Sequence, residues 1–164
     1  KSSDELIMLI GRSVNDISSS EYLVKYHKVD ASPTPYFDLE EEHQLHLCMS
    51  SLIKEKTINA AHDCADGGLF VSLVEMALHS NLGFDIKTNE SIRKDAFLFG
   101  ESQGRVVVTT DKMKLAQVET ICEKFNVPFE IIGKVNADTS IRVNEQIFGN
   151  IEDFRKTSND VINP

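Results

Sequence analysis

The chain has little of what marks several large classes of protein. Its 164 residues include three cysteines and no tryptophan. Cys48, Cys64 and Cys122 are odd in number and form no CxxC pair, so the sequence predicts neither a disulfide framework nor a zinc knuckle. No apolar run approaches the length of a membrane span, and the first residues do not resemble a signal peptide. We therefore expect a cytoplasmic protein with no membrane partner.

Basic residues are also scarce, with 17 Lys and Arg against 26 Asp and Glu and a net charge of −9. A nucleic-acid surface needs clustered Lys and Arg, so we expect no nucleic-acid partner. The length, with 41% hydrophobic residues, suits one soluble domain, which we expect to span residues 1–164. The start at Lys1, directly before an apolar run, suggests a piece of a longer protein.

Hydrophobic periodicity predicts alternating strands and helices, followed by clustered strands. We expect strands at 5–10, 58–63, 84–86, 105–110, 129–135, 141–144 and 146–148. We expect helices at 21–27, 38–55, 68–80, 91–98, 151–156 and after a capping Asp111. This order is typical of an α/β (α+β) layered domain, a mixed β-sheet packed with helices.

Residues 62–69, His-Asp-Cys-Ala-Asp-Gly-Gly-Leu, come directly before a nearly all-apolar segment. They predict a strand-to-helix turn in which Gly67 and Gly68 take positive φ and allow close approach to the main chain. Free N–H groups at the helix start suit a phosphate, so Asp66, Gly67 and Gly68 are candidate phosphate-binding residues. Asp66 is also placed to cap the helix.

Residues 98–105, Leu-Phe-Gly-Glu-Ser-Gln-Gly-Arg, form a second turn before a β-branched strand. The turn N–H groups and the polar side chains can bind a phosphorylated sugar or a nucleotide, which makes Glu101, Ser102, Gln103 and Arg105 further candidates. The alternative is a polar surface turn with an ion pair between Arg105 and Glu101. We expect both turns to lie on one edge of the sheet and to frame a shallow polar cleft.

His62 and Asp63 are weaker candidates, whereas a second histidine pattern does not predict a site. His62 and Asp63 could form an acid–base pair, but neighbours in a strand point to opposite faces, which favours a hydrogen-bonded histidine that fixes the turn. His43 and His46 on a helix cannot converge with Cys48 on one metal ion, and no fourth ligand is evident. The sequence therefore predicts no metal site.

The two turns resemble the HDxSDGGL and LFSESQxR segments of phosphoribosylformylglycinamidine synthase. Two further segments, 9–11 with 18–23 and 131–135 with 141–144, are similar to the family's LLG, GGSEYL and IGxV hairpin motifs. This similarity adds Ser20 and Glu21 as weaker candidates, although serines replace the two family glycines at positions 18 and 19. The resemblance implies the fold of an AIR synthase C-terminal domain.

The resemblance also implies a function for the parent enzyme. With ATP and magnesium, it converts formylglycinamide ribonucleotide and glutamine-derived ammonia to formylglycinamidine ribonucleotide, an ATP-dependent carbon–nitrogen ligase reaction of purine biosynthesis. The HDxSDGG spelling belongs to the later of two domain copies, which lines a second, pseudo-symmetric site that holds a structural nucleotide in some members.

The family's catalytic histidine and magnesium ligands lie in its other domains. The resemblance therefore implies that this chain has no catalytic residue, retains no cofactor and is inactive alone. Its implied partners are the remaining domains of the enzyme, a glutaminase subunit or domain, and a second copy of the fragment. The alternatives are an AIR synthetase or selenophosphate-synthetase-like domain, and a non-catalytic structural or nucleotide-sensing module.

Overall fold

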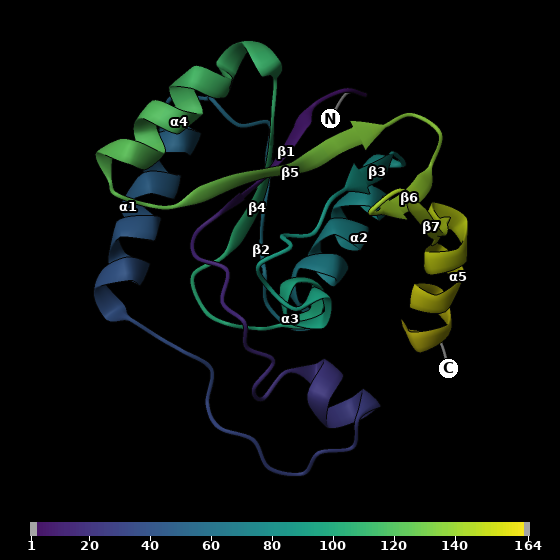
Figure 1. The fold of residues 1–164 in the computed structure, drawn as a ribbon. Coiled ribbons are helices and arrows are strands. Elements are labelled where there is room, and N and C mark those ends of the chain that lie inside the picture. The colour runs from purple at the N-terminus through teal and green to yellow at the C-terminus, as the bar shows by residue number, and fades with distance from the viewer. Residues whose placement is uncertain (1–2, 163–164) are drawn as a thin grey trace.

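The computed structural model describes residues 3–162, and its framework is one seven-stranded mixed sheet (Figure 1). The strands lie in the order β2-β4-β1-β5-β3-β6-β7, and every neighbouring pair is antiparallel except β3 and β6. The strands are β1 Leu6–Ile10, β2 Ala60–Asp63, β3 Gly83–Ile86, β4 Val106–Thr110, β5 Phe129–Asn136, β6 Ser140–Val143 and β7 Gln146–Asn150. This architecture confirms the predicted fold class.

The described residues form five α-helices that pack on the sheet. They are α1 Leu39–Lys54, α2 Gly68–Ser80, α3 Lys94–Phe99, α4 Leu115–Lys124 and α5 Ile151–Ile162. The expected helix at 21–27 is a short π-helix, Tyr22–Tyr26. Asp111 is the N-cap residue of a 3₁₀ turn, Lys112–Lys114, that leads into α4, but its side chain makes no capping hydrogen bond. No helix in the described part of the chain is long and apolar enough to cross a membrane.

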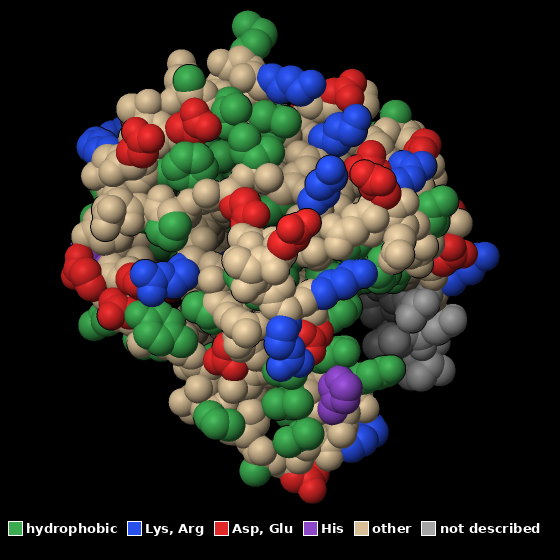
Figure 2. All heavy atoms as spheres, in the orientation of Figure 1, with side chains coloured by type: hydrophobic (Ala, Val, Ile, Leu, Met, Phe, Trp, Pro, Cys, Tyr) green, Lys and Arg blue, Asp and Glu red, His purple; other side chains and the backbone are tan. Residues whose placement is uncertain are grey.

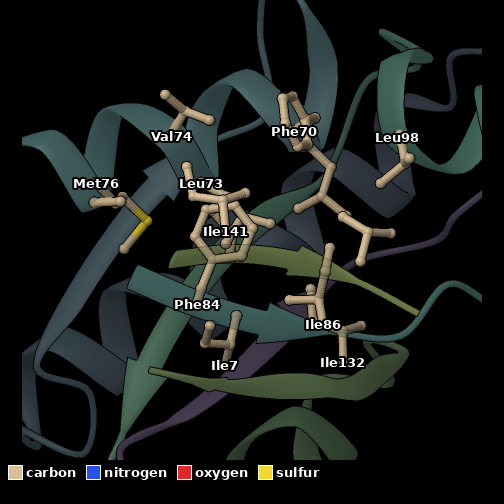
Figure 3. Packing of buried hydrophobic residues seen from close by; sticks show 14 of the residues in the cluster. Ile7, Phe70, Leu73, Val74, Met76, Phe84, Ile86, Leu98, Ile132 and Ile141 are labelled. Carbon is tan, nitrogen blue, oxygen red and sulfur yellow. The ribbon is translucent and has the colours of Figure 1, made fainter. Parts of the chain in front are cut away.

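The helices divide between the two faces of the sheet. Successive residues of β1 alternate, so that Ile7 and Leu9 face one hydrophobic cluster and Met8 and Ile10 face the other. The first cluster lies under α2, α3 and α5, where residues of α2 such as Leu73 pack on the sheet (Figure 3). The second lies under α1 and α4. Helices therefore cover both faces of the sheet. α2 is apolar on most sides because it contacts the sheet, α3 and α5.

The connection between β1 and α1 projects from the layered body (Figure 1). Tyr22 in the π-helix stacks on Tyr26 and on Phe99 at the end of α3, with ring centroids 5.3 and 4.9 Å away. Several hydrophobic side chains gather on this projection (Figure 2), and Val24, Tyr26, Tyr36 and Phe37 are exposed. The stack anchors the projection, while its outer surface stays uncovered in the isolated chain.

Candidate functional site

The two predicted turns meet at one edge of the sheet. One turn joins β2 to α2 and the other joins α3 to β4, and β2 pairs with β4 so that Asp63 lies opposite Val106. The Gly67 N–H donates a hydrogen bond to Oε1 of Glu101 at 2.8 Å. The predicted adjacency of the two turns is confirmed by this contact.

Gly67 and Gly68 have the backbone freedom that the sequence predicts, with φ of 81° and 66°. A Cβ atom on Gly68 would lie 2.6 Å from the carbonyl oxygen of Gly100 in the other turn. Any larger residue at position 68 would therefore clash with backbone and adopt an unfavourable φ. The second glycine lets the two turns pack main chain against main chain.

The Glu101 carboxylate joins three segments of the chain. Its Oε1 also accepts a hydrogen bond from the Glu21 N–H at 2.8 Å, in the projecting connection. The prediction that Asp66 caps α2 is wrong, because the N-cap is Gly67 and the carboxylate that accepts its N–H belongs to Glu101. The start of a helix carries partial positive charge, which a nearby negative charge stabilises. The Glu101 carboxylate supplies that negative charge at the start of α2.

Arg105 is almost fully buried, with 3% of its surface exposed. Its guanidinium donates to the carbonyl oxygens of Phe97, at 3.2 Å, and Gly100. The alternative ion pair with Glu101 is wrong, since both of these bonds go to main-chain carbonyls. Burial lowers the pKa of Arg105, partly offset by the nearby Cys64 thiol. Arg105 therefore holds the end of α3 and the start of the second turn together.

A cleft of about 340 Å³ lies between α1 and the two turns. The residues that line it include four acidic residues, a histidine, an amide and the buried Arg105: Glu42, Asp63, Asp66, Glu101, His46, Gln103 and Arg105. Ser102 instead lines a neighbouring cavity of about 170 Å³, which Gln103 shares. The excess of carboxylates repels a bare phosphate and favours a ligand whose negative charge is already neutralised.

His62 on β2 faces α2 and pairs there with a residue that the sequence reasoning missed. Its Nε2 is 3.0 Å from Oε2 of Glu75 on α2, and its Nδ1 is 2.7 Å from the Asp63 carbonyl oxygen. The Asp63 carboxylate is farther away, 3.6 Å from Nδ1. These distances favour a hydrogen-bonded histidine that fixes the turn over an acid–base pair with Asp63. The sequence signal for Glu75 was weak: only its position on the helix that follows the Gly-Gly turn could have indicated it.

The projecting segment brings one cation to the two turns. Ser20 Oγ accepts a hydrogen bond from the Leu23 N–H at 3.2 Å, in the first turn of the π-helix, whose N-cap residue is Glu21. Glu21 pairs with Lys25 one helical turn later. The pKa of Lys25 is raised, mainly by Glu21 and less by the charges of Asp66 and Glu101. The sequence reasoning missed Lys25, although its spacing of four residues from Glu21 is a usable signal.

No group of three or more His, Cys, Asp or Glu side chains within residues 3–162 is arranged to hold a metal ion. His46 instead lies 3.1 Å from the Glu42 carboxylate on the same helix.

Comparison with known proteins identifies the family of the chain. Residues 2–145 match the family described as "AIR synthase related protein, C-terminal domain". The phosphoribosylformylglycinamidine synthase subunit PurL of Moorella thermoacetica is 32% identical over 148 residues, which cover 90% of this chain and 20% of that protein. The chain thus spans about a fifth of the length of this curated relative.

Solved structures share the fold. The structure of Thermotoga maritima PurL complexed with FGAR aligns with a TM-score of 0.79 at 17% identity, over 93% of this chain and 28% of that one. The same protein complexed with ATP aligns with a TM-score of 0.74 at 17% identity, over 93% and 26% of the two chains.

Proposed function

This chain belongs to the AIR synthase related protein C-terminal domain family, and we propose that it is the second-copy domain of a phosphoribosylformylglycinamidine synthase. The observation that best supports this proposal is the contact between the two motif turns, Gly67 to Glu101, which joins the segments that carry the resemblance. The identity above 30% to a PurL subunit agrees with it. We further propose that residues 1–164 form one domain of a longer enzyme.

In this proposal the parent enzyme uses ATP and magnesium to convert formylglycinamide ribonucleotide and ammonia to formylglycinamidine ribonucleotide. The remaining domains supply the metal ligands, because the described residues offer no suitable cluster. The chain contributes one wall of a site between domains. The T. maritima complexes with FGAR and ATP support these two ligand classes for the parent.

The seven principal candidate residues divide into two roles in this proposal. Gly67, Gly68, Glu101 and Arg105 hold the two turns in place, because their N–H, carboxylate and guanidinium groups already bond within the protein. Asp66, Ser102 and Gln103 line the cavities and are the residues that would contact a ligand. Because the lining is acidic, we propose that this second, pseudo-symmetric site binds a nucleotide together with a cation that neutralises its phosphates.

The partners that we propose are the other domains of the enzyme and a glutaminase that supplies ammonia in the cytoplasm. The exposed side chains of the projection support such docking, since Tyr26 is 72% and Phe37 55% exposed. A fragment that lacks its partner domains should self-associate through this surface. Light scattering that reports a monomer at high concentration would count against this part of the proposal.

A genetic experiment tests the proposed function. The complete protein that contains this chain should restore purine-free growth to a bacterium that lacks PurL, whereas residues 1–164 alone should not. Growth that still requires added purine, despite soluble expression of the complete protein, would refute the proposal. The purified chain should likewise release no phosphate from ATP with substrate, magnesium and ammonia. Release that depends on Glu101 or Arg105 would refute its assignment as an incomplete half-site.

A further inference from the structure

Two buried thiols face each other away from the motif turns. Cys48 on α1 and Cys122 on α4 are fully buried, and their Sγ atoms are 3.8 Å apart. Both belong to the cluster under the outer helices α1 and α4. Cys64, the third cysteine, is in the cluster on the opposite face.

We propose that Cys48 and Cys122 form a reversible, peroxide-driven disulfide that staples α1 to α4. A disulfide requires the sulfurs to approach to about 2.05 Å, which side-chain rotation and a small helix shift can supply from the observed separation. Because α1 and α4 are outer elements, a small oxidant can reach the thiols through local opening of a helix without unfolding of the sheet. The proposal is independent of the proposed function.

The two thiols have different roles in the reaction. The hydrogen bond between them lowers the pKa of Cys48, and the same contact, with burial, raises the pKa of Cys122. The Cys48 thiolate attacks hydrogen peroxide, which gives a sulfenic acid and hydroxide. Cys122 then attacks the Cys48 sulfur, forming the S–S bond as the sulfenic oxygen leaves as water. In total, two thiols and one peroxide yield one disulfide and two waters.

The position of Cys48 connects this bond to the cleft. Leu45 and Met49, within one turn of Cys48 on α1, line the cleft from the side opposite the motif turns. A bond to α4 restrains the wall that these two residues form. Oxidation therefore limits how far α1 can move relative to the turns.

The experiment oxidises the purified 164-residue chain with hydrogen peroxide. We expect the count of free thiols, measured after denaturation, to fall from three to one, and the mass to fall by about 2 Da. Peptide mapping should join Cys48 to Cys122, and dithiothreitol should reverse each change. The melting temperature of the oxidised chain should rise by roughly 5 °C or more, because the bond closes a long loop.

Matched variants separate this pair from general thiol oxidation. Cys64→Ser should form the same disulfide and retain no free thiol, whereas Cys48→Ser and Cys122→Ser should each lose the intramolecular bond. A gain of oxygen mass without the cross-linked peptide would overturn the proposal. So would a melting temperature that falls on oxidation, or no oxidation of the folded chain under conditions that oxidise it in urea. Because the decisive mass measurement uses the unaltered chain, a poorly folding variant does not affect the outcome.

Discussion

Removal of the Glu101 carboxylate is the perturbation that most directly probes how the motif turns are joined. Glu101→Ala deletes the acceptor of two main-chain N–H groups, those of Gly67 and Glu21. Hydrogen bonds to charged groups contribute about 1.5–3 kcal/mol each, so the two together set an upper bound of about 3–6 kcal/mol. Glu101 is half-buried, and water can replace part of its contribution. We expect a loss of about 2–3 kcal/mol in the free energy of unfolding.

Glu101→Gln separates charge from hydrogen bonding. Its amide oxygen can still accept both N–H groups, so its loss should be about 1 kcal/mol, smaller than that of Glu101→Ala. Formate, a small carboxylate, should bind in the vacated space and restore part of the stability of Glu101→Ala, with little effect on the unaltered chain.

Urea unfolding followed by circular dichroism measures these differences at constant ionic strength. Glu90→Ala is a matched control, because that carboxylate is exposed and accepts no hydrogen bond from the described residues. Three results would refute the reasoning: a Glu101→Ala variant as stable as the control, a Gln variant less stable than the Ala variant, or no selective effect of formate.

Three further comparisons test other parts of the structure. Gly68→Val should lower the free energy of unfolding by about 3 kcal/mol or more, because the side chain clashes with backbone and φ is positive. Cys64→Ser should lower it by roughly 1–2 kcal/mol. Equal losses for the two variants in urea unfolding would contradict this. Glu145→Gly should raise it by about 0.5–1 kcal/mol, because Glu145 has φ of 68° in a two-residue hairpin turn; an unchanged urea midpoint would argue against turn strain. Hydrogen bonds from Arg142, then from Ser140, lower the pKa of Asp138, so its stabilisation is present at neutral pH and is lost as pH falls below about 4. The melting temperature of Asp138→Asn should therefore fall further below that of the unaltered chain at pH 7 than at pH 3, and a pH-independent difference would contradict this linkage.

Local features of the fold could be predicted because short segments determine them. The Gly-Gly turn and the following apolar run predict helix 68–80, and the structure has α2 at Gly68–Ser80. The β-branched run similarly predicts β4. The parallel pairing of β3 with β6 and the strand order depend on long-range packing, for which a single sequence carries no local signal.

The same division applies to the site. The sequence predicts that the two turns lie on one edge of the sheet, and the structure confirms that they are adjacent. The partners of individual side chains were harder to predict: Glu101 bonds to Glu21, 80 residues away, and Arg105 bonds to carbonyls instead of the nearby carboxylate. Charge and spacing predict an ion pair between Arg105 and Glu101. The buried guanidinium instead donates to the carbonyl oxygens of Phe97 and Gly100.

The central claim, that this chain acts as a domain of a phosphoribosylformylglycinamidine synthase, is most directly tested by a domain exchange. Residues 2–145 would replace the matching segment of Moorella thermoacetica PurL, and formation of ADP would be measured with ATP, magnesium, ammonia and formylglycinamide ribonucleotide. A second chimera with Gly68→Val is the control for an intact arrangement of the two turns. We expect substrate-dependent ADP formation by the first chimera and a large loss in the second. A folded first chimera that binds ATP but forms no ADP in response to substrate would contradict it.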